Sequence, residues 1–215
     1  QWAQLLNDLS EECDFRNCVA MPDMSGSMYG LPMNVSATLG ILVAKVAAKQ
    51  GSKFGDLLIT FSDQPSFLDL SKSNKLIDNV KTLALGHSNG FNTDLYKAFA
   101  IIIEKSIEKN VASSEFPEKM IIFTDMQFDE AVEDYTIMDS LDDLFDKSPY
   151  SRPQIVCWNL RNVANVCVTS EHKDVALVSG FSKDMFKNIM NNVITTPYDV
   201  MRNTIDNPRY DRIQS

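Results

Sequence analysis

Residues 17–28 read NCVAMPDMSGSM and join a short, nearly all-apolar run to a polar turn. Such a run, without polar alternation, is typical of a strand buried on both faces of a parallel sheet. The turn that follows places Asp23, Ser25 and Ser27 at alternate positions just beyond the expected strand end. Open α/β sheets bind ligands beyond the carboxyl ends of their strands. This stretch therefore predicts an α/β fold with a ligand site after its first strand.

Further runs of the same kind predict the rest of the sheet. Parallel strands are expected at residues 56–61 (DLLITF), 119–124 (KMIIFT), 154–158 (QIVCW) and 175–179 (VALVS). Residues 66–70 follow the first of these after only four residues, too few for a crossover helix, so they predict an antiparallel hairpin strand. Patterns with apolar residues three and four apart predict helices at residues 34–49, 95–109 and 182–192.

These elements define one fold class. We expect a doubly wound, mainly parallel six-stranded sheet in the order 3-2-1-4-5-6, with strand 3 antiparallel at the edge and helices on both faces. Residues 15–195 would form this domain, residues 1–14 a lead-in helix or linker, and residues 196–215 a partly helical tail. Pro22 has no backbone N–H to donate and is compatible with this sheet only at a strand's end.

Composition narrows the classes of function. The 215 residues include 29 acidic and 20 basic side chains, for a formal net charge of -9, which argues against direct nucleic-acid binding through a broad basic face. Lys45 and Lys49 interrupt the longest apolar helical pattern, so we expect no membrane span. Four cysteines without a CxxC pair indicate structural thiols in a reducing, cytoplasmic compartment. The chain begins with Gln1 rather than Met, which suggests a fragment of a longer protein.

Two later segments add to the first turn. Residues 90–95 (GFNTDL) place Thr93 just before a predicted helix, and residues 124–126 (TDM) place Asp125 at the end of a predicted strand. With Asp23, Ser25 and Ser27, these residues resemble the metal-ion-dependent adhesion site (MIDAS) of the von Willebrand factor A (vWA) domain family, written D-x-S-x-S, then Thr, then Asp. All five positions of that motif are filled.

The resemblance implies a role for each of these residues. Ser25, Ser27 and Thr93 would be direct or near-direct oxygen ligands of a cation, and Asp23 and Asp125 would act largely through bound water. Oxygen ligands suit Mg²⁺, which keeps several of its waters; Mn²⁺ and Ca²⁺ are alternatives. The rim of the site would contain four further residues: Met24, Gly26, Asp94 and Asp129.

Longer blocks narrow the resemblance within the vWA group. The blocks CVAMPDMSGSMYGLPM, GFNTDLYKAF, FTDMQFDEA, IVCWNLRN and VALVSGFSK, within about residues 15–193, resemble a mostly intracellular branch found in eukaryotes and some of their large viruses. That branch is related to the A domain of the Ro ribonucleoprotein. The resemblance implies a vWA fold in this chain.

The resemblance implies a non-enzymatic, Mg²⁺-dependent module that binds a partner protein through an exposed Asp or Glu. One alternative is the A domain of an RNA-associated, Ro-like protein whose RNA-binding part lies outside this chain. Another is a Mg²⁺-dependent phosphohydrolase with Asp23 as nucleophile, although Ser25 occupies the position where such chemistry normally has a second carboxylate. The five motif residues could also be turn and capping residues. The sequence predicts no oligomeric state.

Overall fold

The computed structural model of the 215-residue chain describes residues 1–60, 64–86, 94–125, 137–161 and 175–179. The chain divides into two compact units, Gln1–Gly180 and Phe181–Ser215, and the described residues all belong to the first. The helix predicted at residues 182–192 lies outside the described residues. The predicted domain boundaries stay a prediction.

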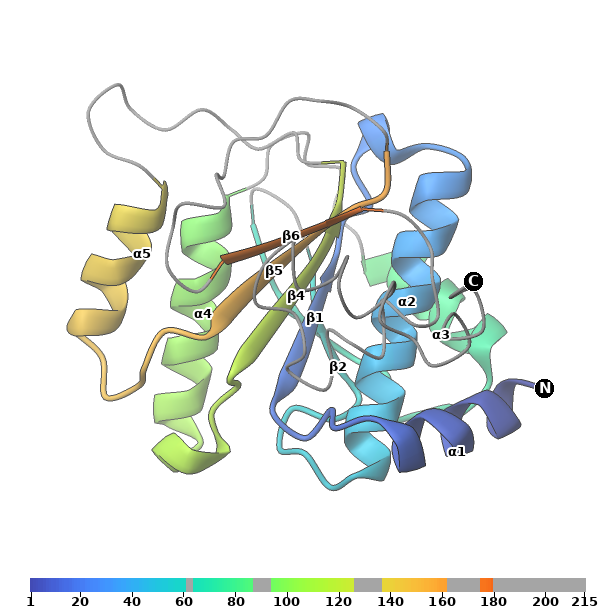
Figure 1. Cartoon of the computed structure of the whole chain (residues 1–215), viewed down its shortest axis with the longest axis horizontal. Helices are drawn as coiled ribbons and strands as arrows, with labels where there is room; N and C mark the ends of the chain where they lie inside the picture. Colours follow the sequence, from blue (N-terminus) through green and yellow to red (C-terminus); the bar gives the residue numbers. More distant parts are fainter. Residues whose placement is uncertain (61–63, 87–93, 126–136, 162–174, 180–215) are drawn as a thin grey trace, which may run out of the picture. The chain divides into compact units, whose positions relative to one another are not determined.

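The sheet has the predicted strand order, β3-β2-β1-β4-β5-β6, and is drawn in Figure 1. Only the β2–β3 pair among its neighbours is antiparallel, which confirms the short hairpin at the edge. The strands are β1 (Cys18–Pro22), β2 (Leu57–Ile59), β3 (Phe67–Asp69), β4 (Lys119–Thr124), β5 (Gln154–Asn159) and β6 (Val175–Ser179). Pro22 is the last residue of β1, where the absence of its N–H is tolerated.

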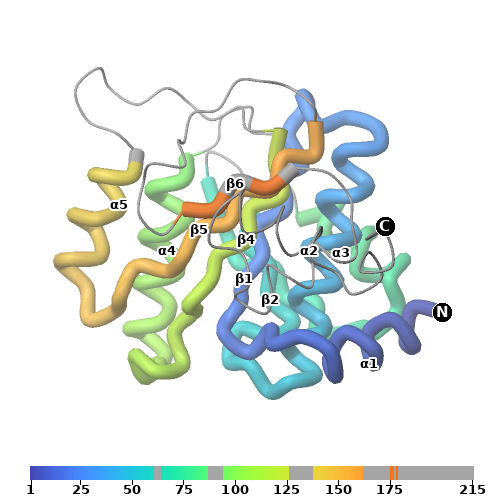
Figure 2. Tube along the Cα trace, in the orientation of Figure 1, coloured from blue at the N-terminus to red at the C-terminus, as the bar shows by residue number. Residues whose placement is uncertain are grey.

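Helices cover both faces of this sheet, as Figures 1 and 2 show. On one face α2 packs on β1 and is flanked by α1 and α3, and on the other face α4 packs beside α5. The helices are α1 (Trp2–Glu12), α2 (Leu31–Lys49), α3 (Leu76–Gly86), α4 (Leu95–Glu108) and α5 (Ile137–Asp146), with 3₁₀ turns η1 (Gly26–Met28) and η2 (Ser113–Glu115). The helix α3 was not predicted from the sequence.

The core on the α4 and α5 side explains why the central strands lack polar alternation. All five residues of β1 and all six of β4 are buried. Phe99 and Ile102 of α4 lie in one apolar cluster with Met120 and Ile122 of β4. Fully burying one such side chain contributes about 1.5–3 kcal/mol to stability. Because Val19 and Met21 of β1 belong to the same cluster, this packing holds β1 and β4 in place beside each other.

The helix α2 corrects one expectation. Its 19 residues are long and apolar enough to cross a membrane by length and composition alone, so the prediction that lysines break this run was wrong. Lys45 does not interrupt the apolar pattern, because its side chain is buried and its Nζ lies 2.6 Å from Asp56 Oδ1 and 2.7 Å from the carbonyl oxygen of Leu70. More than half of the helix is buried inside the protein, where it packs on β1.

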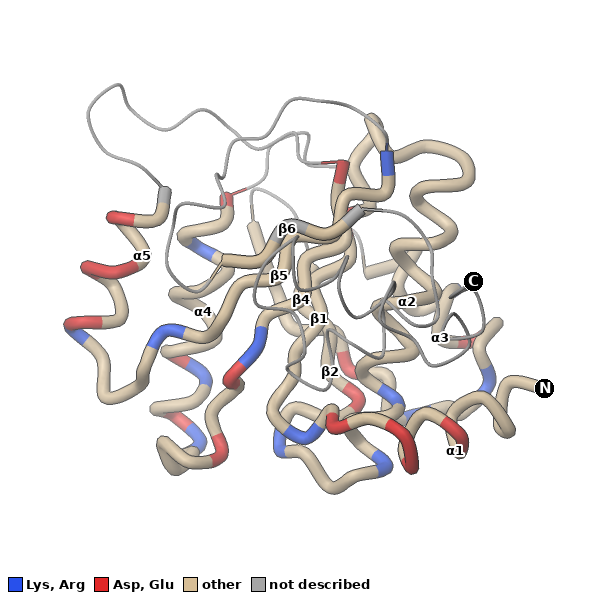
Figure 3. The backbone as a smooth tube through the Cα atoms, viewed as in Figure 1, with Lys and Arg blue, Asp and Glu red and all other residues tan. Residues whose placement is uncertain are grey.

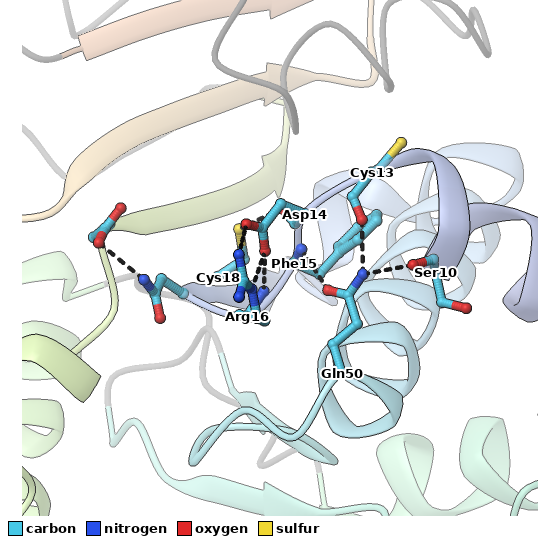
Figure 4. A network of polar contacts seen from close by, with 9 residues as sticks. Ser10, Cys13, Asp14, Phe15, Arg16, Cys18 and Gln50 are labelled. Carbon is cyan, nitrogen blue, oxygen red and sulfur yellow. Dashed lines mark hydrogen bonds and ion pairs between the residues drawn. The ribbon is translucent and has the colours of Figure 1, made fainter.

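A polar network joins the segment before β1 to the end of α2 (Figure 4). The side chain of Gln50 accepts a hydrogen bond from the backbone N–H of Phe15 at 2.7 Å. Its amide nitrogen donates to the carbonyl oxygens of Ser10 at 2.9 Å and Cys13 at 2.7 Å. Gln50 thus holds the end of α1 and the start of β1 against the last turn of α2.

Candidate metal site

The two aspartates of the predicted site follow neighbouring parallel strands. Asp23 comes directly after β1 and Asp125 directly after β4, and the register pairs Pro22 with Phe123. The backbone N–H of Asp23 donates to the carbonyl oxygen of Phe123 at 2.9 Å, which continues the pairing past the strand end. Both aspartates are 1% exposed. The structure therefore brings Asp23 and Asp125 together beyond the carboxyl ends of two central strands, where α/β folds bind ligands.

The two serines of the turn are less buried than these aspartates. Ser25 and Ser27 are half-buried, and their Oγ atoms lie 3.0 Å apart. Oδ1 of Asp23 accepts a hydrogen bond from the backbone N–H of Ser25 at 2.8 Å, which fixes the direction of the turn. The turn thus brings two half-buried hydroxyl groups close to a buried carboxyl group.

Thr124 contributes to the site although the sequence reasoning gave it no role. Its hydroxyl donates to Oδ2 of Asp23 at 2.8 Å, so Asp23 is held from both sides, by Thr124 and by Ser25. On α2, the hydroxyl of Ser36 donates to the carbonyl oxygen of Phe123 at 3.1 Å and links this helix to the end of β4. A threonine at the end of a strand is common, so the sequence carries no signal for the hydrogen bond from Thr124 to Asp23.

Electrostatics at Asp23 favours a cation nearby. Burial raises the pKa of the Asp23 carboxyl, hydrogen bonds from Ser25 and Thr124 lower it, and the charge of Asp125 raises it again. A positive ion between the two carboxylates would offset both the loss of hydration and the repulsion between like charges.

The donor atoms fit a hard divalent cation. Asp23, Ser25, Ser27 and Asp125 offer only oxygen, the ligand atom that Mg²⁺ and Ca²⁺ prefer. No cluster of three or more His, Cys, Asp or Glu side chains occurs among the residues that the structure describes. A metal at this edge would therefore depend on hydroxyl oxygens as well as on the two carboxylates.

The remaining predicted site residues have mixed outcomes. Thr93 and Asp129 lie outside the described residues. Asp94 is the N-cap of α4: its carboxylate accepts a hydrogen bond from the backbone N–H of Lys97 at 2.9 Å and forms an ion pair with Lys97 Nζ at 2.8 Å. Met24 is half-buried in the turn beside Ser25. The roles of Asp94 and Met24 at the rim stay predictions.

Gly26, expected at the rim of the site, does not need the conformational freedom of a glycine. It begins the 3₁₀ turn η1 without a positive φ, and a Cβ atom built on it would meet nothing within 4 Å. Gly30, the N-cap of α2, has the left-handed φ of 97° instead. The backbone conformation that requires glycine thus occurs four residues later, where the chain enters α2.

The strand order and the turn after β1 together define the type of fold. The described part of the chain has a vWA-like fold, with a candidate metal site at the ends of β1 and β4. The chain belongs to the family described as "Domain of unknown function (DUF7788)", whose model matches residues 17–210.

Individual proteins resemble the chain as follows. It is 31% identical over 212 residues to "Uncharacterized protein L728" of Acanthamoeba polyphaga mimivirus; the match includes 96% of this chain and 36% of that protein. Among solved structures, it resembles the Ro (RSR) protein of Deinococcus radiodurans with a TM-score of 0.56 and 17% identity, over 83% of this chain and 34% of that one. The chain thus spans only about a third of the length of these two proteins.

A second solved structure is proximal thread matrix protein 1 from the mussel byssus. Its TM-score is 0.52, with 15% identity over 85% of this chain and 48% of that one. Another structure of the same mussel protein, with a zinc-occupied MIDAS motif, has a TM-score of 0.50 and 14% identity over 83% of this chain and 47% of that one. At these identities the similarity to Ro and to the mussel protein concerns the fold.

Proposed function

We propose that this chain is a non-enzymatic, Mg²⁺-dependent protein-binding module that captures an acidic side chain of a partner. One observation carries the proposal: Asp23 and Asp125 are buried side by side at two strand ends, and the hydroxyls of Ser25 and Ser27 lie half-buried with their oxygens 3.0 Å apart. This arrangement offers a cation two buried carboxyl groups together with two neutral hydroxyl oxygens.

The neutral oxygens favour binding over bond cleavage. When bound, Mg²⁺ would retain part of its positive charge and an exchangeable position that a carboxylate can fill. Asp23 is held by the backbone N–H of Ser25 and the hydroxyl of Thr124, so it is suited to orienting the turn. A phosphohydrolase would need a second carboxylate as general acid, and the turn has Ser25 at that position.

The zinc-occupied MIDAS motif of the mussel protein supports the idea that this type of site accepts a divalent cation. For this chain we propose Mg²⁺, with Mn²⁺ or Ca²⁺ as alternatives, because the described donors are all oxygens. The proposed location is intracellular. Cys18 and Cys157 are buried free thiols, which suits a reducing compartment.

A peptide selection tests the capture of an acidic group. The immobilised chain is offered a random peptide library in the presence of Mg²⁺, and bound peptides are released with a chelator. Enriched peptides should share an Asp or Glu, and replacing it with Asn or Gln should weaken binding by at least tenfold. Peptides that bind equally well without the acidic residue, or in chelator, would contradict the proposal.

The two other functions give different results. A phosphohydrolase would hydrolyse members of a phosphoester panel in Mg²⁺ and lose that activity on Asp23→Asn, whereas we expect no turnover from either protein. An RNA-associated module that binds RNA itself would retain RNA in a filter assay. We expect no retention by this acidic chain at physiological salt.

A further inference from the structure

A pocket lies between the last turns of α4 and the β2–β3 hairpin, away from the candidate metal site. Its volume is about 330 Å³, at the lower end of the range of small-molecule sites. Leu57, which lines it, is the first residue of β2, and β2 runs parallel to β1. Phe67, which also lines the pocket, pairs with Ile59, so the pocket extends along the β2–β3 hairpin, and none of its lining residues belongs to the candidate metal site.

The walls of this pocket are mainly apolar. Phe54 is buried, and four other apolar side chains remain partly exposed at the pocket surface. These four are Leu57, Phe67, Ile101 and Val111. Phe67 lies on the α4 side of the hairpin, and its neighbour Leu68 faces α3, where a Cβ atom added at Gly86 would meet it. An apolar ligand would complete the burial of this part of the sheet.

Three lysines surround the same pocket: Lys53, Lys105 and Lys109. No acidic side chain is among its lining residues, although the whole chain has a net charge of -9. Figure 3 shows basic and acidic residues alternating along α4, which contains Glu104 and Glu108 as well as Lys97 and Lys105. The pocket therefore combines an apolar wall with three rim lysines, two of which form ion pairs with glutamates outside the lining.

The rim lysines are able to reorient toward a ligand. Lys53 Nζ lies 3.6 Å from a carboxylate oxygen of Glu115, and Lys105 Nζ lies 2.7 Å from one of Glu108. Both pairs are substantially exposed, and exposed ion pairs contribute little to stability. Lys109 is exposed at the C-cap of α4. An anion can therefore recruit these ammonium groups at small cost.

We propose that this pocket binds a small amphipathic carboxylate, a molecule with an apolar aliphatic or aromatic body and one anionic head. The apolar body lies against Phe67 and Ile101, and the carboxylate is held by Lys105 and Lys109. The volume of the pocket suits a free small molecule. This site is independent of the metal site and of its proposed protein partner.

Calorimetry on the full chain, with decanoate as probe and decanol as its neutral control, tests the proposal. Decanoate should bind saturably at one site, and its affinity should fall at higher salt because screening weakens the lysine contribution. Decanol should bind at least tenfold more weakly. Absence of saturable binding, or equal affinity for the two probes, would overturn the proposal.

Variants locate the binding to this pocket. Lys105→Gln combined with Lys109→Gln should weaken decanoate binding about tenfold, and Ile101→Trp should abolish it by filling the space. Lys81→Gln, at an exposed lysine of α3 on the other face of the sheet, is the matched control and should bind like the wild type. If the double lysine variant, shown to be folded by circular dichroism, also binds like the wild type, the assignment is wrong.

Discussion

Replacing Lys45 with methionine should destabilise the fold by about 3 kcal/mol. The ammonium group lies 2.6 Å from Asp56 Oδ1 and 2.7 Å from the carbonyl oxygen of Leu70, so it joins α2 to the β2–β3 hairpin. Methionine keeps most of the apolar volume but removes both interactions. A hydrogen bond from a charged donor contributes about 1.5–3 kcal/mol. Breaking a fully buried ion pair on one side costs about 3–5 kcal/mol.

The expected value is at the low end of the range for a buried ion pair because Asp56 keeps 25% of its side chain exposed and water can hydrate its carboxylate. Urea unfolding, monitored by circular dichroism, measures the change in the free energy of unfolding. Lys49→Met is the matched control, one turn further along α2; it removes only an exposed hydrogen bond from Nζ to Asn7 Oδ1 and should change stability by about 1 kcal/mol or less. Adding Asp56→Asn to Lys45→Met should recover part of the loss. Equal effects of the two lysine replacements would refute the reasoning.

Two further predictions concern packing. Burial raises the pKa of the Cys157 thiol to about 12, so its thiolate fraction at pH 8 should be about a thousandfold below that of an ordinary cysteine. A variant with Cys157 as its only cysteine should react with iodoacetamide only after urea unfolding; rapid reaction in the native state would contradict this. Gly55→Ala should cost about 1–3 kcal/mol, because the new Cβ would lie 2.3 Å from the Cα atom of Ala48. Gly26→Ala, whose Cβ meets nothing within 4 Å, is its control in the same urea assay, and equal stability of the two variants would be the contrary result.

The central features of the fold were predictable because burial leaves a direct mark on sequence. Strands covered on both faces, such as β1 and β4, have no polar alternation, and the short connection before β3 leaves no room for a helix. The helix α3 left no such mark. Among its residues the buried ones are Asn79 and Leu83, and one of these is polar, so the apolar period is too weak to recognise.

The part of the candidate site that could be predicted is the part whose residues are close together in the sequence. Asp23, Ser25 and Ser27 occur in one turn, and Asp125 is placed beside them by the strand order. The hydrogen bond from Thr124 to Asp23 was not predictable, since it depends on the register between β1 and β4. The positive φ of Gly30 was not predictable either, because a glycine next to a turn does not reveal its backbone conformation in sequence.

Calorimetric titration with Mg²⁺ tests the central claim most directly. The wild type should bind one Mg²⁺ saturably, and the double variant Asp23→Ala, Ser25→Ala should give no heat of binding although circular dichroism shows it folded. Asp8→Ala with Ser10→Ala, which removes the same pair of residue types at the same spacing on α1, should bind like the wild type. No heat from the wild type, or equal heat from the wild type and the site variant, would contradict the metal site.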